Sequence, residues 1–199
     1  MISRRQFLSA LAAGATVPFS TSSWASANPV QEIIAKFDSV KTISGGFVQF
    51  EPRGSQSEGS FGISRPGKAV FDYSGGGLKM ISDGRSVGIN NRKLGTWDLY
   101  PLSKTPLKLL LGTGIDLRPL IKLSKEGSST ISFLMADKQA LGDFTVEMVF
   151  DKESHELRQW TTVDQRGLET TVVVYDVAFN KPLPASLFRI PYGEIRTLK

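Results

Sequence analysis

The chain has 199 residues, of which 40% are hydrophobic and 22% are charged, a composition typical of one globular domain. Because cysteine is absent, disulfides, thiolate metal sites and cysteine nucleophiles are excluded. The single histidine, His155, excludes a multi-histidine metal site, and we expect neither a metal nor a cofactor. The net charge of 24 − 19 = +5 is mild and the basic residues are scattered, which argues against a nucleic-acid partner.

Residues 1–27 have the features of an export signal. Arg4 and Arg5 precede a mostly apolar run over residues 7–19, which is too short to cross ~30 Å of hydrocarbon as a helix. Small residues at 25–27 fit a cleavage site, so we expect a mature periplasmic chain, 28–199, with a net charge of 22 − 19 = +3. The paired arginines resemble a twin-arginine signal, and a general secretory signal is the alternative.

An amphipathic helix is predicted over residues 29–41. Apolar residues recur there at helical spacing, namely Val30, Ile33, Ile34, Phe37 and Val40. Asn28 is suited to cap the first turn, and a proline at position 29 is tolerated at a helix start. Two glycines at positions 45 and 46 then end the pattern.

From residue 47 onward, apolar residues alternate with polar ones, which predicts β-strands. Turn residues separate short strands over 47–50, 59–65, 69–73, 78–81, 87–89, 94–100, 130–136, 144–151, 157–164, 169–177 and 187–190. About ten or eleven strands, joined mostly by short hairpins, predict a mainly β protein whose antiparallel sheet coils or closes. The segment 107–111 is short, apolar and compatible with a helix.

The apolar face of such a sheet must be covered, and the first helix and segment 107–111 are the only evident covers. A strongly curved sheet under a small α-helical lid encloses an apolar space. If the lid packs fully, this space is an ordinary core; if it packs loosely, the space is a pocket for an apolar ligand. Periodicity does not separate these outcomes, and for a single inward aromatic such as Phe61 the ordinary core is the default.

Four motifs follow one another over residues 29–190. They are Phe47-Val48-Gln49 after the first helix, Gly59-x-Phe61-x-Ile63-x-Arg65-Pro66-Gly67-Lys68, Ile81-Ser82-Asp83-Gly84, and Thr105-Pro106-Leu107 followed by Leu110-Leu111. In this combination they resemble the periplasmic outer-membrane lipoprotein carrier family, LolA. The resemblance implies an incomplete, strongly curved antiparallel β-barrel with a small α-helical lid, over a single domain of residues 28–199.

The resemblance also implies a function. The family suggests a periplasmic chaperone without catalytic activity that takes acylated lipoproteins from an inner-membrane ABC transporter to an outer-membrane acceptor, either a protein or the membrane. We expect a monomer. The alternative is a periplasmic regulatory module on the same scaffold that senses lipid or a misplaced lipoprotein. The chain departs from the family pattern at Ala69, where an aromatic residue is frequent, and in its twin-arginine-like signal.

The residues predicted to bind acyl chains are apolar and alternate along the strands. They are Phe47, Phe61, Ile63, Phe71, Met80, Ile89, Trp97, Leu99, Leu110, Met148, Phe150 and Trp160. Arg65 shares a face with two of them if its strand is regular, and a buried unpaired charge is costly. The free carbonyls at the end of a lid helix are suitable acceptors. The resemblance implies that Arg65 is a latch that lipid releases; the alternative is an exposed arginine at a strand end.

No catalytic constellation is evident in the sequence. Residues 153–156 place a serine, His155 and two glutamates together, but adjacent side chains rarely converge, and their position between two strands predicts a solvated hairpin turn. The three glycines at 75–77 lack the strand–helix context and the lysine of a phosphate loop. Asp137 and Asp143 flank another turn without the spacing of a calcium loop.

Overall fold

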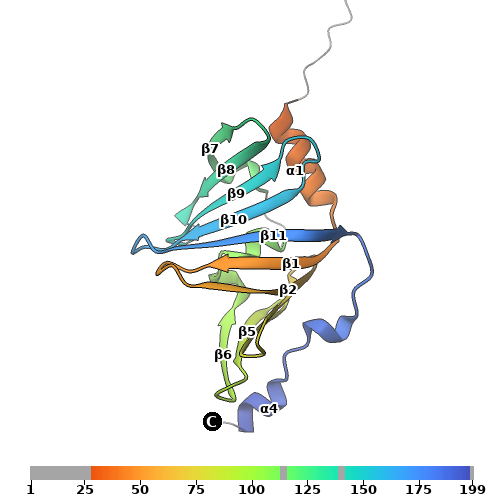
Figure 1. The fold of residues 1–199 in the computed structure, drawn as a ribbon, viewed down its shortest axis with the longest axis vertical. Coiled ribbons are helices and arrows are strands. Elements are labelled where there is room, and N and C mark those ends of the chain that lie inside the picture. Colours follow the sequence, from red (N-terminus) through yellow and green to blue (C-terminus); the bar gives the residue numbers. More distant parts are fainter. Residues whose placement is uncertain (1–27, 113–115, 139–141, 198–199) are drawn as a thin grey trace, which may run out of the picture.

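A computed structural model describes residues 28–112, 116–138 and 142–197, so the predicted export signal lies outside the described residues. One open sheet holds eleven antiparallel strands in the order β6-β5-β4-β3-β2-β1-β11-β10-β9-β8-β7 (Figure 1). The strands are β1 (Thr42–Phe50), β2 (Gln56–Ser64), β3 (Lys68–Tyr73), β4 (Leu78–Asp83), β5 (Ser86–Asn91), β6 (Thr96–Pro101), β7 (Ile121–Glu126), β8 (Thr130–Ala136), β9 (Thr145–Asp151), β10 (Leu157–Val163) and β11 (Glu169–Phe179). The prediction of a mainly β fold with an incomplete, curved sheet is confirmed.

The sheet curls so strongly that its two halves face each other. Strands β3 and β10 are separated in the sheet by β2, β1 and β11, so a flat sheet would hold them about 19 Å apart. The rings of Phe71 on β3 and Trp160 on β10 are nevertheless only 6.1 Å apart, centroid to centroid. One core cluster consequently joins residues from both halves of the sheet and from the helices.

Helix α1 (Pro29–Ser39) begins where the sequence predicts it. The side-chain Oδ1 of Asn28 accepts a hydrogen bond of 3.1 Å from the backbone N–H of Val30, which satisfies one of the unpaired donors of the first turn. The helix buries Ile33, Ile34 and Phe37. The ring of Phe37 meets that of Phe150 on β9 edge-on at 5.7 Å, so α1 covers the half of the sheet that β9 belongs to.

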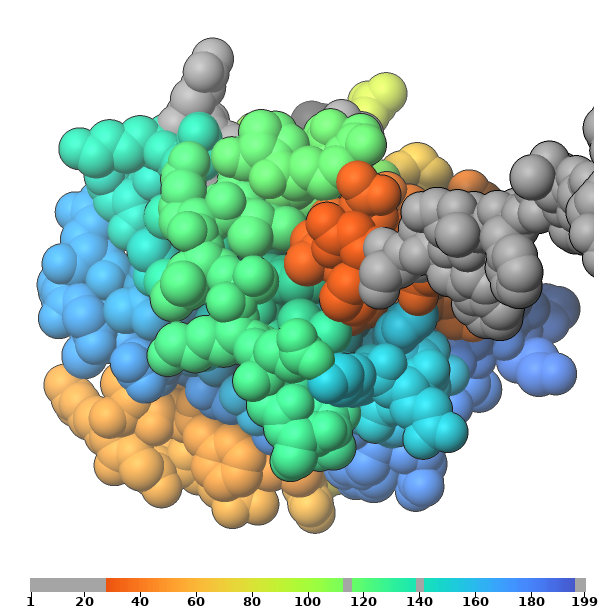
Figure 2. Space-filling model, turned by 90° about the horizontal axis from the view of Figure 1, so that it is seen from above, coloured from red at the N-terminus to blue at the C-terminus, as the bar shows by residue number. Residues whose placement is uncertain are grey.

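The edge strands β6 and β7 do not pair with each other, and the chain that joins them carries the second part of the lid. This connection holds η1 (Leu102–Lys104), α2 (Leu107–Leu110) and η2 (Arg118–Leu120). It buries the side chains of Leu109 and Leu110 in the core. In Figure 2 the green segment that contains these turns lies beside the red-orange α1 over one end of the molecule. In the described ranges, no helix is long and apolar enough to cross a membrane.

The C-terminal segment packs on the outer face of the sheet. It contains η3 (Ala185–Phe188) and α4 (Tyr192–Thr197), and runs past the lower strands in Figure 1. A second apolar cluster lies beneath it, formed by Val70, Ile81, Phe188, Ile190 and Ile195. The predicted strand over 187–190 is therefore wrong. Prolines at 182, 184 and 191 interrupt this stretch, and a proline has no N–H for a β-ladder.

The close approach of β2 and β3 predicts that Gly59 cannot be replaced. A Cβ at Gly59 would lie 2.1 Å from the backbone oxygen of Asp72 and 2.9 Å from the ring of Phe47. We expect Gly59→Ala to lower the free energy of unfolding by about 1–3 kcal/mol, the usual cost of overpacking. Chemical denaturation measures this. Gly62→Ala on the same strand is the control, because its Cβ would meet only side chains at 3.4 Å. Equal stability of the two variants would contradict the prediction.

Candidate functional site

An apolar cavity of about 220 Å³ lies between the two halves of the curled sheet. Strands β4, β5 and β6 form one wall, strands β9 and β10 form the other, and the connection that carries α2 closes it. The lining residues are Met80, Val87, Ile89, Tyr100, Thr105, Pro106, Leu107, Leu110, Val146, Met148, Trp160 and Thr162. Because nearly all of this lining is apolar, transfer of a hydrocarbon group from water into the cavity is favourable, and the cavity is suited to an apolar group.

The size of the cavity limits what the closed protein can hold. At about 220 Å³ it exceeds a ~150 Å³ apolar cavity that binds benzene, but it is smaller than the ~300–1,000 Å³ typical of drug-sized ligands. Tyr100, whose surface is 47% exposed, stands at the rim. The space therefore accommodates part of a hydrocarbon chain, and a larger ligand requires α2 and its neighbours to move.

Ten of the twelve predicted acyl-binding residues belong to the interior of the sheet. Five of them line the cavity, namely Met80, Ile89, Leu110, Met148 and Trp160. Five others are buried in the surrounding core, namely Phe47, Phe61, Ile63, Phe71 and Phe150. Ala69, the position that departs from the family pattern, is also fully buried in this core. In this structure Phe61 is a buried core residue, which was the default interpretation of its place in the sequence.

Trp97 and Leu99 do not join this set, and their predicted placement in the pocket is corrected here. On β5, Ile89 faces the interior and pairs with Asp98 on β6. Neighbouring residues point to opposite faces of a strand, so Trp97 and Leu99 point outward. Trp97 packs against the outer apolar cluster, and Leu99 is 41% exposed.

Seven lining residues were missed by the sequence analysis. Val87 and Val146 lie on the interior face of predicted strands, so the alternation pattern already contained the signal for them. Tyr100 and Thr162 also lie on strands and face the cavity. The remaining three, Thr105, Pro106 and Leu107, form one of the motifs that carry the family resemblance, but they lie in a connection without periodicity that could mark them as lining residues.

Arg65 joins both lid helices to the end of β2. Its Nε donates a hydrogen bond of 3.0 Å to the backbone oxygen of Leu110 in α2. Its Nη1 donates to the backbone oxygens of Phe37 in α1 and of Val40, the latter at 3.4 Å. These carbonyls lie at helix C-termini, where no intrahelical donor reaches them and where the helix dipole favours a cation. The guanidinium carbon also lies 3.8 Å from the centroid of the Phe37 ring.

Burial makes this arginine costly to keep charged. Desolvation lowers the pKa of Arg65 to about 10, and the nearby Asp38 carboxylate opposes the shift. Nη2 is buried, and it alone among the buried side-chain nitrogen and oxygen atoms of the described residues has no hydrogen-bond partner. The helix-end carbonyls therefore replace most, but not all, of the hydrogen bonds to water that the guanidinium loses on burial.

Two backbone hydrogen bonds reinforce the same junction. The N–H of Arg65 donates to the oxygen of Lys41, which follows α1, at 2.8 Å. The N–H of Gly67 donates to the oxygen of Leu111, which follows α2, at 3.0 Å. The turn between β2 and β3 thus holds the ends of both lid helices through side-chain and backbone contacts.

At the other end of the interior face, a short chain of polar side chains replaces the apolar ones. The hydroxyl of Tyr73 donates to Oε1 of Gln49 at 2.8 Å, and Nε2 of Gln49 donates to Oε1 of Glu51. The ring of Tyr73 packs edge-on against Phe47 at 5.0 Å. Burial, together with the charge of Glu51, raises the pKa of Tyr73 to about 12.

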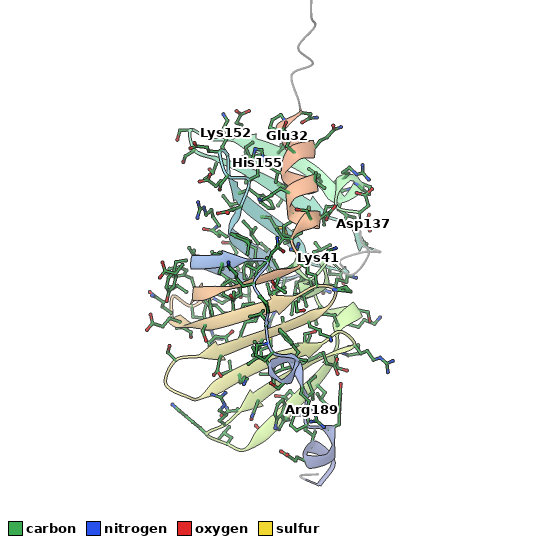
Figure 3. The ribbon with its side chains drawn as sticks, turned by 90° about the vertical axis from the view of Figure 1, so that its right-hand side faces the viewer. Glu32, Lys41, Asp137, Lys152, His155 and Arg189 are labelled. Atoms are coloured by element: carbon green, nitrogen blue, oxygen red, sulfur yellow. The ribbon has the colours of Figure 1, made fainter. Side chains whose placement is uncertain are left out.

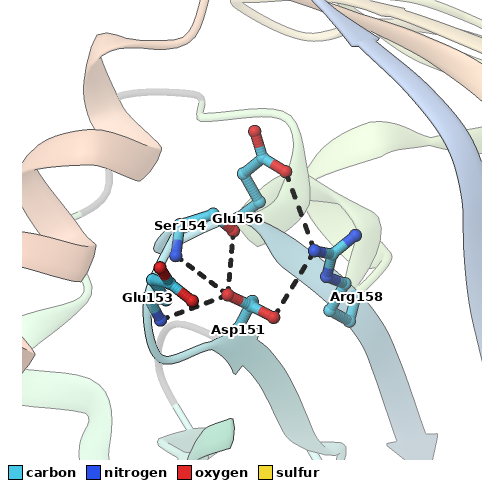
Figure 4. Close-up of polar contacts among 5 residues, drawn as sticks. All are labelled: Asp151, Glu153, Ser154, Glu156 and Arg158. Atoms are coloured by element: carbon cyan, nitrogen blue, oxygen red, sulfur yellow. Dashed lines mark hydrogen bonds and ion pairs between the residues drawn. The ribbon is translucent and has the colours of Figure 1, made fainter. Parts of the chain in front are cut away.

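The segment 153–156 is a hairpin turn between β9 and β10, as predicted. Oδ1 of Asp151 accepts hydrogen bonds from the backbone N–H groups of Glu153 and Ser154, at 3.1 and 2.8 Å (Figure 4). His155 faces α1 rather than the serine, with Nε2 3.8 Å from a carboxylate oxygen of Glu32 (Figure 3). Within the described residues, no group of three or more His, Cys, Asp and Glu side chains is placed to hold a metal ion.

Comparison with known proteins identifies related sequences and folds. The family model for the outer membrane lipoprotein carrier protein LolA matches residues 38–191. The outer-membrane lipoprotein carrier protein of Chromohalobacter salexigens is 28% identical over 203 residues, covering 95% of this chain and 96% of the relative. Two solved structures share the fold, each with a TM-score of 0.50. A DUF1329 family protein from Desulfovibrio piger is 10% identical and covers 81% of this chain and 98% of its own. An uncharacterized conserved protein from Thermus thermophilus is 9% identical and covers 82% of this chain and 95% of its own.

The burial of Tyr73 predicts a pH dependence. The difference between the phenolate absorbance titrations of the wild type and Tyr73→Phe should show one tyrosine with a midpoint near pH 12 instead of the ordinary value of about 10. Because the unfolded chain releases this proton first, the contribution of Tyr73 to stability is complete below about pH 10. It is lost as the pH rises toward 12. Glu51→Gln should lower the midpoint, and an unshifted midpoint in the wild type would contradict the assignment.

Proposed function

Because the chain belongs to the outer membrane lipoprotein carrier protein (LolA) family, we propose that it is a periplasmic, non-catalytic carrier of acylated lipoproteins. It receives the acyl chains of a lipoprotein released from the inner membrane by an ABC transporter and delivers them to an acceptor at the outer membrane. Residues 28–199 form the carrier domain after removal of the signal peptide.

The observation that carries this proposal is the double role of Leu110. Its side chain lines the apolar cavity, and its backbone oxygen accepts the hydrogen bond from Nε of Arg65. A hydrocarbon chain that enters beyond the closed volume must displace the α2 backbone, and that displacement breaks the bond to Arg65. Ligand entry and lid opening are therefore coupled through one residue.

The energetics suit a carrier that must release what it binds. Each buried methylene contributes about 0.8 kcal/mol, so ten methylenes contribute ~8 kcal/mol before ordering costs, which corresponds to near-micromolar binding. Opening the lid costs the charge-assisted hydrogen bonds of Arg65, each worth about 1.5–3 kcal/mol. Closing the lid recovers this energy, so it favours departure of the chain. Nine of the ten interior residues predicted for acyl binding lie on the sheet and are the surface that an open lid would expose, and the tenth, Leu110, belongs to the lid itself.

The proposal is tested by identifying what the protein carries. Protein purified from periplasm should yield a triacylated lipoprotein when its bound lipid is extracted and analysed by mass spectrometry. Recovery of free lipid together with a stable signalling partner would overturn the carrier proposal. That result would favour the alternative, a regulatory module that senses lipid or misplaced lipoprotein.

Replacing the latch should separate binding from delivery. We expect Arg65→Leu to retain lipoprotein binding but to deliver it at least about tenfold more slowly, since it lacks one or more charge-assisted bonds of about 1.5–3 kcal/mol that close the lid. A transfer assay from the loaded protein to outer-membrane vesicles measures delivery. Arg118→Leu is the control, because Arg118 is exposed and pairs with Asp116, two residues away. Delivery by Arg65→Leu at the control rate would remove the latch from the mechanism.

A further inference from the structure

The interior face of the sheet changes from apolar to polar within one step along several strands. Two residues beyond Phe47, Ile89 and Trp160, the same face presents Gln49, Asn91 and Thr162. Residues two apart on a strand share a face and lie about 7 Å apart. Each of these three apolar residues therefore has a hydrogen-bonding neighbour immediately beyond it on its strand.

These polar residues, here called the polar rim, lie on both halves of the sheet and are interrupted on β4, where Leu78 pairs with Asn91. The rim consists of Gln49, Ser57, Tyr73, Asn91, Thr162 and Thr170, all half-buried. The strand register brings them together: Gln49 pairs with Ser57 between β1 and β2, and Thr162 pairs with Thr170 between β10 and β11. Contacts connect the rim to the apolar interior, because Thr162 lines the cavity and Tyr73 packs against Phe47.

The rim also borders a second, open hollow, whose lining mixes polar and charged side chains with Leu78. A depression of about 590 Å³ lies at the β3–β4 turn, and its lining includes Ser57, Tyr73 and Asn91. Asn91 lines this hollow and uses Oδ1 to accept a hydrogen bond of 3.2 Å from the N–H of Leu94, so Nδ2 is the donor that this side chain can offer a ligand. The hydroxyls of Ser57 and Thr162 are further donors on this face.

We propose that the polar rim binds the carbonyl-bearing head of an acylated glyceryl group while its chains occupy the apolar cavity. This assignment rests on the proposed carrier function and adds the part of the ligand that the rim recognises. Ester and amide carbonyls are acceptors without charge, and they match the amide of Asn91 and the hydroxyls of Ser57 and Thr162. The Tyr73 hydroxyl and Nε2 of Gln49 already donate within the rim and to Glu51. An unsubstituted hydrocarbon would leave those donors unpaired, so the site prefers an amphipathic ligand.

The test compares two aspartate substitutions at neighbouring positions. Asn91→Asp keeps the Oδ1 that caps the hairpin but removes the Nδ2 donor. Asn90→Asp makes the same change of charge on the opposite face, where Asn90 pairs with Trp97. Binding is measured with two ligands, a tripalmitoylated cysteinyl peptide and the carbonyl-free dye N-phenyl-1-naphthylamine. Thr162→Val is a second rim variant, since it removes a hydroxyl with little change of shape.

We expect Asn91→Asp and Thr162→Val each to weaken peptide binding about two- to tenfold, the equivalent of one hydrogen bond. Dye binding should be unchanged in Asn91→Asp, and it should not weaken in Thr162→Val, which makes the cavity lining more apolar. Asn90→Asp should bind both ligands like the wild type. Equal peptide binding by all variants, or an equal loss for peptide and dye, would overturn the rim assignment. If the wild type bound neither ligand, the carrier proposal itself would fail, and that outcome is distinct from failure of the rim alone.

Binding of a phospholipid, measured in the same way, identifies which carbonyls of the ligand the rim binds. Dimyristoyl phosphatidylcholine shares the glyceryl esters of the peptide but lacks its N-acyl amide. A parallel loss of phosphatidylcholine binding in Asn91→Asp assigns the rim to the esters, and a loss confined to the peptide assigns it to the amide. Each result supports the rim as the head-binding site.

Discussion

The lid of this protein is held to the sheet by one half-buried cation, which donates hydrogen bonds to backbone oxygens. Arg65 donates to carbonyls at the ends of both lid helices, and it comes from the sheet that those helices cover. A lysine would present one compact charge, whereas the guanidinium fork reaches two helix ends at once. Its Nη2 lacks a partner, so the closed arrangement is not fully compensated for the loss of hydration. A contact that is strong but incomplete is suited to repeated opening.

The geometry of the sheet explains why such a contact is needed. A closed barrel would hold its interior by hydrogen bonds between all neighbouring strands. Here β6 and β7 stay apart, and the chain between them fills the gap with α2 and short turns. Most of the interior is packed, and the cavity of about 220 Å³ is small. A ligand larger than this cavity would therefore need the lid to move, as the proposed function requires.

The sequence predicted the helices and strands of this fold better than it predicted which face of the sheet each side chain occupies. Helix α1 and the hairpins follow from capping, periodicity and turn residues, which are local properties. Alternation shows that Trp97 and Leu99 share a face, but it does not show which face. The register with β5 and the C-terminal segment on the outer face decide that, and both depend on residues distant in the sequence. The acceptors of Arg65 lie 25 to 45 residues away, so their identity also required the tertiary structure.

The latch and the polar rim lie at opposite ends of the same strand. Ser57 is near the start of β2 and Arg65 follows its end, eight residues later, a distance of about 26 Å for extended chain. A ligand whose head lies at the rim therefore points its chains toward the lid. Thr162 of the rim and Leu110 of the lid line the same cavity, so a chain that fills it contacts α2, and in the proposed mechanism a chain that needs more room disturbs the bond to Arg65. In the proposed arrangement the head group sets the orientation of the ligand, and the volume of its tail determines whether the lid opens.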